Sequence, residues 1–417
     1  MQESNNGGQS RVLITMRISA LLLGFTVPIS VAIDNLLLAI VLLVVIFNFR
    51  DVWKIAIQHS VARAAWLLFI ALSLAVFYGA APLREAVGAL GKYADLAFVP
   101  LFMFLLHKDV WRLRAQYAFL AAMGLTLFLS YVIGFKLLPV QHWMSSFTVV
   151  DNPAIFHSHI TQNNMMAFAA FLALLRCRYA LTHQLRLVWG AFAVLAIANI
   201  LFMVQGRTGY LILLVLLCWF AWTTLARYMR SCGRALSWRY GVPVILLLVA
   251  SVVTIFLASP RLHERVSLVG SEIQAWQPNH GKDTSTGTRL DFYYNSIQIV
   301  RQHPFFGIGT GGFAAAFAEE TKGTEVLQTP NPHNEYLLIT TQAGVLGLAL
   351  LLYLFYTTWR CAPLLGTALE QDAARGLVLA YMVNCALNSA LHDHADGLFF
   401  SWMVAVLFAG LLQRKHR

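Results

Sequence analysis

Residues 62–80 read ARAAWLLFIALSLAVFYGA, with Arg63 as the only charged side chain. A run of about 20 apolar residues forms a helix long enough to cross the hydrocarbon core of a bilayer. The whole chain of 417 residues has this character, because 59% of it is hydrophobic, only 12% is charged and the mean hydropathy is +0.65. Soluble proteins are roughly half apolar and a quarter charged. The composition therefore excludes a soluble globular enzyme, a disordered chain, a collagen and a coiled coil.

Similar apolar runs recur along the chain, and they predict an all-α, polytopic membrane protein with about 12 transmembrane helices. The expected helices span residues 12–30, 33–49, 62–80, 93–107, 115–135, 160–177, 187–204, 209–226, 241–258, 334–358, 375–392 and 395–412. The fourth is short enough to be tilted or broken, and a very tight turn joins the last two. No small-residue cleavage site follows the first run, so we expect that run to stay in the protein as a helix.

The formal net charge of +11 is explained by topology. Lys and Arg concentrate in cytoplasmic loops of membrane proteins. With both termini in the cytoplasm, 20 of the 30 basic residues lie inside. The ten on the outer side are Arg84, Lys92, Lys136, Arg207, Arg261, Arg265, Lys282, Arg289, Arg301 and Lys322. No compact basic domain with interleaved aromatic residues is present, so nucleic acid is not an expected partner. The five cysteines form no CxxC pair and no zinc spacing, and no disulfide framework is expected.

The expected topology leaves one long outer segment, residues 259–333, between the helices of residues 1–258 and those of residues 334–417. A loop of this length is usually functional or disordered, and its helical pattern favours function. Thr288 is the expected N-cap of a helix that ends at His303-Pro304, with Asp291 as a weaker stand-in for the usual capping-box Glu. A helix lying on the membrane surface and a helix that presents Arg289 are both compatible with this pattern.

Two outer arginines are candidate anion ligands. Arg207 lies between Gly206 and Gly209 at the expected start of a helix, where free N–H groups bind anions. Arg289 follows Thr288 at a second helix start, and a guanidinium presents a planar fork suited to pyrophosphate oxygens. The plainer alternatives are a snorkelling side chain for Arg207 and an exposed loop charge or headgroup contact for Arg289.

His333 is the candidate general base. Asn331 is the expected N-cap and Pro332 the first residue of the tenth helix, which places His333 in the first turn. The helix dipole there disfavours the imidazolium, and a neutral imidazole accepts a proton. The alternative is a histidine that only hydrogen-bonds a carbonyl at a helix end.

Several further motifs carry weaker signals. Arg84 with Lys92, and Arg261 with Arg265, are candidates to line an anion path. Residues 307–312, GIGTGG, match GxGxxG but follow no apolar strand, so we expect a tight turn there and no dinucleotide fold. The His-x-His pairs at residues 157–159 and 392–394 have few carboxylates nearby, and no metal site is expected. The 392–394 turn could instead orient a base.

Three classes of function suit a polytopic membrane protein: a transporter, a non-catalytic scaffold and a transferase. A transporter usually needs ionisable groups near the bilayer centre, whereas acidic residues here, Asp34 and Asp95 included, lie in loops or near helix ends. A non-catalytic scaffold leaves the outer arginines and His333 without a role. The outer polar residues therefore favour a transferase that acts on a lipid-linked anionic substrate.

Three segments carry a resemblance to a known family. These are residues 206–209 (GRTG), Arg289-Leu290 followed by residues 303–309 (HPFFGIG), and residues 332–337 (PHNEYL). Together with the single large outer loop they resemble the bacterial O-antigen ligase family, whose relatives are the O-antigen polymerases and the bacterial protein O-oligosaccharyltransferases. The motifs cover about 50 residues, and the rest of the chain matches only in hydropathy.

The resemblance implies a GT-C type glycosyltransferase of the inner membrane. It implies transfer of a glycan from undecaprenyl diphosphate to a sugar hydroxyl of lipid A–core at the periplasmic face, with inversion and without a metal or nucleotide cofactor. In this chain it implies that His333 is the base and that Arg207 and Arg289 hold the diphosphate, with Arg265 and Arg84 assisting. O-antigen polymerase and protein O-oligosaccharyltransferase remain the alternatives.

Overall fold

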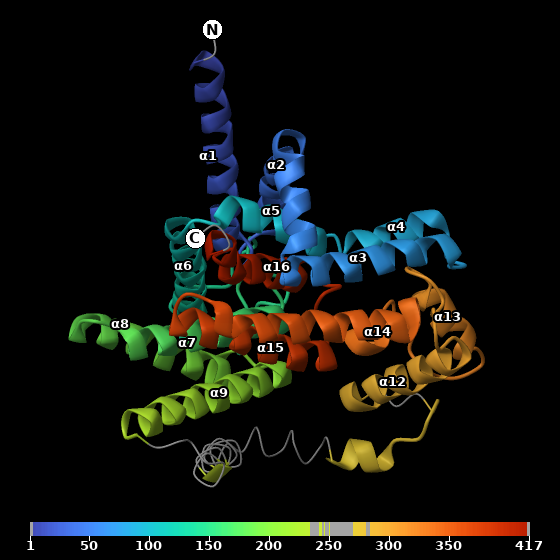
Figure 1. Ribbon diagram of the computed structural model, residues 1–417. Helices are drawn as coiled ribbons and strands as arrows, with labels where there is room; N and C mark the ends of the chain where they lie inside the picture. The colour runs from blue at the N-terminus through green and yellow to red at the C-terminus, as the bar shows by residue number, and fades with distance from the viewer. Residues whose placement is uncertain are drawn as a thin grey trace.

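The computed structural model describes residues 3–233, 242–243, 246, 250, 270–280 and 284–414, and all of its regular elements in these ranges are helical (Figure 1). The helices are α1 (Glu3–Thr26), α2 (Val31–Gln58), α3 (Ser60–Tyr78), α4 (Leu83–Gly91), α5 (Asp95–Leu106), α6 (Asp109–Gly134), α7 (His159–Tyr179), α8 (His183–Ala198), α9 (Arg207–Ser231), α12 (Ser285–Gln302), α13 (Phe313–Glu320), α14 (Glu335–Cys361), α15 (Ala368–Leu387), α16 (His394–Phe408) and α17 (Leu411–Arg414). A π-helical turn, Asn199–Met203, continues α8. The expected helix at residues 241–258 lies outside the described residues.

Within the described residues, six helices are long and apolar enough to cross a membrane, or seven if the bent α2 counts as one span. The chain is thus a multi-pass membrane protein, and the number of 12 spans stays a prediction. Three of the other expected spans are not among these candidates, for identifiable reasons. The apolar part of α1 and helix α16 are short, and α7 begins with Gln162, Asn163 and Asn164, which lower its hydropathy. These polar side chains are buried, so α7 is an interior helix.

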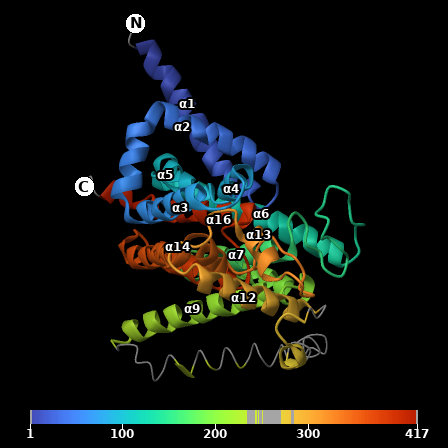
Figure 2. The same cartoon turned by 90° about the vertical axis from the view of Figure 1, so that its right-hand side faces the viewer.

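The bundle is built around α15. In Figure 1, helices α3, α14, α15 and α9 run side by side, and α15 also packs against α7 and α16. Helix α16 is buried along its whole length from Ala395 to Phe408, and Trp402 donates its indole N–H to the Ala20 carbonyl. The view in Figure 2 shows the N-terminal part of α1 extending away from this packed centre. Both ends of α15 are therefore surrounded by other helices.

The fourth expected span, residues 93–107, corresponds to the single helix α5, and it is short because a turn separates it from the preceding helix α4. Helix α4 ends at Gly91 and α5 begins at Asp95, with Lys92, Tyr93 and Ala94 in a turn between them. The two pieces together form one candidate span, Leu83–Leu106.

The long outer segment contains α12 and α13, which share a small core of their own formed by Phe292, Ile299, Phe313, Phe317, Val326 and Leu338. The prediction that Thr288 caps the first of these helices is wrong. Thr284 is the N-cap, because its hydroxyl accepts the Gly287 N–H at 3.1 Å, and Thr288 lies inside the first turn. The helix does end at His303, as predicted.

The glycine-rich segment after α12 is a backbone turn, as predicted, and it is inserted into a break in α14. Gly307 and Gly309 have left-handed φ angles of +68° and +88°. The Ile308 and Gly309 N–H groups donate to the Thr341 and Gln342 carbonyls at 2.8 and 3.0 Å. Those carbonyls are free because α14 is interrupted at Gly344, whose φ is +64°. A Cβ at Gly309 would lie 2.2 Å from the Gly79 Cα, so only glycine fits.

Candidate active site at the C-terminal end of α15

The last turn of α15 is the point where the predicted site residues meet. The final carbonyls of a helix have no partner inside the helix and need donors from elsewhere. Arg289 of α12 donates to the Leu387 carbonyl at 3.2 Å. The Ala386 carbonyl accepts the Asn334 side-chain amide at 2.9 Å and the Tyr293 hydroxyl at 3.5 Å. The same Tyr293 hydroxyl donates to the His333 carbonyl at 3.3 Å. These bonds hold α12 and the residues before α14 against one helix end.

Arg207 is the first residue of α9, as predicted, and it reaches toward the start of α12. Its guanidinium donates to the Thr286 hydroxyl at 3.2 Å, and the residue is exposed. Gly206 and Gly209 place this helix start close to α7, because a Cβ on either would lie 2.8 or 2.5 Å from Asn163. The neighbouring Thr208 accepts the Asn388 amide at 3.2 Å, which ties α9 to the residue after α15.

His333 does not lie in the first turn of a helix, so that prediction is corrected. Helix α14 begins at Glu335, and Asn334 is its N-cap, accepting the Leu337 N–H at 3.0 Å. His333 precedes the cap in a left-handed conformation with φ +51°, which is uncommon for a residue with a side chain. The Asn331 side chain stabilises this turn by accepting the His333 N–H at 3.0 Å across Pro332.

The electrostatic setting keeps the His333 imidazole neutral at pH 7. Burial, and then the charge of Arg289, lower the pKa of His333 below its usual value. The neutral state is the one expected from the sequence, but its cause is burial and a neighbouring cation. The ring is half-buried and stacks on Phe292, with centroids 6.0 Å apart and an interplanar angle of 24°.

Arg289 is a half-buried cation with a neighbour of the same charge. Burial lowers the pKa of Arg289, and the charge of Arg207 lowers it further, against an opposing effect of Tyr293. Arginine still stays protonated at neutral pH. In the described part of the chain Arg289 forms no salt bridge and bonds only a backbone carbonyl. We name Arg207, Arg289 and His333 the His333 cluster, and its charge suits an anionic ligand.

Sequence reasoning missed Glu335 and Ser389, which support this cluster. The buried Glu335 carboxylate accepts the Tyr93 hydroxyl at 2.8 Å and the Leu391 and His392 N–H groups at 2.8 and 3.2 Å. Ser389 donates to the Asn331 side chain at 3.0 Å. Glu335 lies inside the PHNEYL motif, which was the available signal, whereas nothing local to Ser389 indicated its contact.

The remaining candidates stand apart from the His333 cluster. Arg84 is exposed in the first turn of α4 and forms no hydrogen bond or salt bridge with a described residue. Arg265 lies outside the described residues. His392 is half-buried, and burial and then the charge of Lys92 lower its pKa to about 3. Among the residues described, no group of three or more His, Cys, Asp or Glu side chains is arranged to hold a metal ion.

Three buried acidic residues lie near helix ends, as the sequence predicted for Asp34 and Asp95. Asp34, Asp95 and Asp396 each lie in the first turn of a helix, although all three are buried. Helix N-termini stabilise negative charge, so their location has a structural reason.

The fold and cluster define a multi-pass, all-helical membrane protein with a cationic site at one end of its bundle. Residues 191–352 match the family model described as O-antigen ligase, a range that contains Arg207, Arg289 and His333. The resemblance of this chain to the O-antigen ligase family is thereby confirmed. A protein of Haemophilus influenzae described as uncharacterized is 24% identical over 123 residues, which cover 27% of this chain and 31% of the relative. The match thus spans about a third of that relative's length.

Proposed function

We propose that this protein is an O-antigen ligase that transfers a glycan from undecaprenyl diphosphate to a sugar hydroxyl of lipid A–core. The reaction takes place at the periplasmic face of the bacterial inner membrane, with both termini in the cytoplasm and about 12 spans in a GT-C type arrangement. The observation that carries the proposal is that a neutral histidine and a half-buried arginine, which has no carboxylate partner among the described residues, converge on the last turn of α15. The family match over residues 191–352 supports the same class of reaction.

The His333 imidazole accepts the proton of the attacking hydroxyl. The hydroxyl oxygen forms the new glycosidic bond to the anomeric carbon while the bond from that carbon to the diphosphate oxygen breaks, with inversion. Arg289 and Arg207 neutralise the charge that develops on the leaving undecaprenyl diphosphate. Fixed cations aimed at developing charge are usually a large term in catalysis. In this scheme the guanidinium groups take the part that a metal ion takes in other glycosyltransferases, and no cofactor is needed.

Arg84 and Arg265 are proposed as further contacts for the diphosphate or its glycan. Arg84 opens α4, whose Ala86 lies against the glycine-rich segment at Gly311. This places α4 beside the segment that follows α12.

The proposal is tested with a deletion strain that is complemented by variants. His333→Ala should abolish capped lipopolysaccharide, with lipid-linked polymer accumulating, while the protein still inserts in the membrane. His280→Ala is the matched control, since His280 is an exposed histidine of the same segment whose side chain bonds, among the described residues, only the Pro278 carbonyl. A near-normal lipopolysaccharide ladder from His333→Ala would refute the assignment.

The same deletion strain separates the alternatives. Loss of all capped lipopolysaccharide identifies a ligase. A single capped repeat identifies an O-antigen polymerase, which uses a lipid-linked glycan as both donor and acceptor. Normal lipopolysaccharide with an unglycosylated pilin-like protein identifies a protein O-oligosaccharyltransferase.

A further inference from the structure

A second polar region surrounds the other end of α15, where its first turn meets the start of α6 and the end of α7. A cavity of about 750 Å³ lies there, lined among others by Asp109, Arg112, Gln116, Arg176, Thr367 and Glu370. Its volume falls in the range of roughly 300–1,000 Å³ that small-ligand pockets occupy. The sequence places this end of the bundle in the cytoplasm. We call it the Arg176 pocket.

One wall of the Arg176 pocket is neutralised within the protein. Arg112 forms salt bridges with Asp109 at 2.8 Å and with Glu370 at 3.0 Å. Glu370 also closes a capping box with Thr367 at the start of α15. The Arg112 guanidinium thus has two carboxylate partners, so these three side chains together carry one net negative charge and Arg112 is not available to an anion.

The pocket is also lined by an arginine of α7, Arg176, that has no carboxylate partner among the described residues. Arg176 is only 8% exposed, and its guanidinium donates to the Gln116 side chain at 2.8 Å. It lies 4.3 Å from the ring centroid of Tyr117 and 5.6 Å from that of Trp189. Its Nε atom has no hydrogen-bond partner, and Arg176 forms no salt bridge with any residue that the structure describes. Aromatic faces attract a cation, but burying a charge without a counter-ion is costly.

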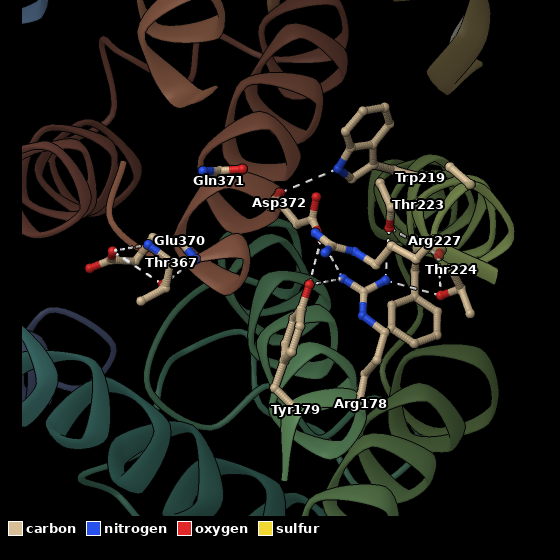
Figure 3. A network of polar contacts seen from close by, with 12 residues as sticks. Arg178, Tyr179, Trp219, Thr223, Thr224, Arg227, Thr367, Glu370, Gln371 and Asp372 are labelled. Atoms are coloured by element: carbon tan, nitrogen blue, oxygen red, sulfur yellow. Dashed lines mark hydrogen bonds and ion pairs between the residues drawn. The ribbon is translucent and has the colours of Figure 1, made fainter. Parts of the chain in front are cut away.

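The surroundings of the pocket add positive charge. Arg178 and Arg227 both bind the single carboxylate of Asp372, as Figure 3 shows. Ala368 and Leu369 form the first turn of α15 and line the pocket. The first N–H groups of a helix have no partner within it and carry partial positive charge.

We propose that the Arg176 pocket binds a phosphate-bearing anion that pairs with the Arg176 guanidinium. Two sources have this chemistry: the headgroup of an anionic phospholipid of the surrounding leaflet, and free inorganic phosphate. A bias of Lys and Arg toward the cytoplasm explains how many arginines lie at this end. It does not explain why Arg176 is buried at this cavity without a carboxylate partner among the described residues. Basic pockets between membrane helices on the cytoplasmic side are known to hold such headgroups. The pocket does not depend on the transfer reaction proposed above.

The test measures binding to the full-length protein in detergent micelles by native mass spectrometry and by thermal unfolding. The probes are phosphatidylglycerol, phosphatidylcholine and inorganic phosphate. Arg176→Gln should weaken phosphatidylglycerol binding by about 10-fold, because a charge-assisted contact is lost. Arg114→Gln is the matched control, since Arg114 is an exposed arginine of α6 outside the pocket, and it should bind as the wild type does. Protection by inorganic phosphate without added lipid would support the pocket and identify the free anion as its source.

A second variant covers the case in which Arg176→Gln does not fold. Gly366 is exposed at the edge of the pocket and its φ is not left-handed, so a side chain is tolerated there. Gly366→Glu should repel the anion and weaken binding, while Gly366→Gln should not. Equal binding by the wild type, Arg176→Gln and Gly366→Glu would overturn the proposal. Binding of neither phosphatidylglycerol nor phosphate by the wild type would overturn it as well.

Discussion

The two ends of α15 use arginine in different ways. At the C-terminal end, Arg289 bonds a backbone carbonyl and has no carboxylate partner in the described chain. At the N-terminal end, Arg112 and Arg178 are held by Glu370 and Asp372, which lie one turn apart or less on α15 itself. A cation bound by a carboxylate stabilises helix packing, whereas a cation bound only by a carbonyl keeps its charge available for a substrate. Arg176 lies at the N-terminal end but also has no carboxylate partner among the described residues, and the proposed anion site rests on this.

The largest expected effect concerns the unpaired arginine. Arg289→Ala should reduce transfer by about 100- to 1,000-fold, since removing one oriented electrostatic group typically has that effect. The measurement is transfer in membrane vesicles with lipid-linked donor. Arg301→Ala is the control, because Arg301 is exposed on the same helix and contacts only Gln298. Equal activity of the two variants would mean that Arg289, although it has no carboxylate partner in the described chain, does not act on the substrate.

A smaller effect is expected at the carboxylate-bound end, and on stability instead of activity. Asp372→Asn leaves Arg178 and Arg227 without their shared anion. Breaking a buried ion pair by removing one partner costs about 3 kcal/mol or more, so the thermal midpoint should fall. Asp51→Asn breaks the exposed pair with Lys54 and should change stability by less than about 1 kcal/mol. An unchanged midpoint for Asp372→Asn would mean that this network does not stabilise the bundle.

The smallest expected effect is in the pH dependence of transfer. The base form of His333 is lost as the pH falls through its folded-state pKa, and burial with Arg289 lowers that pKa. An unperturbed histidine is half protonated at about pH 6.5. The rate at that pH should therefore fall by less than about twofold relative to pH 7.5 in the wild type. A loss of half the rate at a pH above 6.5 would contradict the lowered pKa of His333.

The helices were largely predictable, because apolar runs of membrane length leave few other structures open to the chain. The turn before α16 was also predicted, whereas α4 and its break from α5 were not. The start of α12 was not, since Thr284 and Thr288 are both good N-caps and only packing distinguishes them. The apolar runs predict membrane helices whichever residue caps each helix.

The members of the candidate site remain a prediction from the sequence, and their geometry was not predicted. Arg207, Arg289 and His333 were named from their motifs, but the left-handed turn at His333 arises from the Asn331 side chain and from bonds to α15. The Arg176 pocket was not anticipated. Its arginines had a sufficient explanation in topology, and the pairing of Arg178 with Asp372 joins residues distant in sequence. Such pairings follow from tertiary packing, which local patterns do not encode.

The interruption of α14 at Gly344 affects how Arg289 and His333 are positioned relative to each other. The segment that follows α12 is hydrogen-bonded to α14 at this interruption. The Ile308 and Gly309 N–H groups donate to carbonyls of α14, and the Val345 N–H donates to the Pro304 carbonyl. These bonds attach the segment that follows α12, the helix of Arg289, to α14, the helix that follows His333. A flexible connection would let Arg289 and His333 move relative to each other, and a misplacement of about 1 Å can lower the rate by about a hundredfold. Backbone hydrogen bonds thus join two distant segments of this membrane protein, as a disulfide bond does in many secreted enzymes.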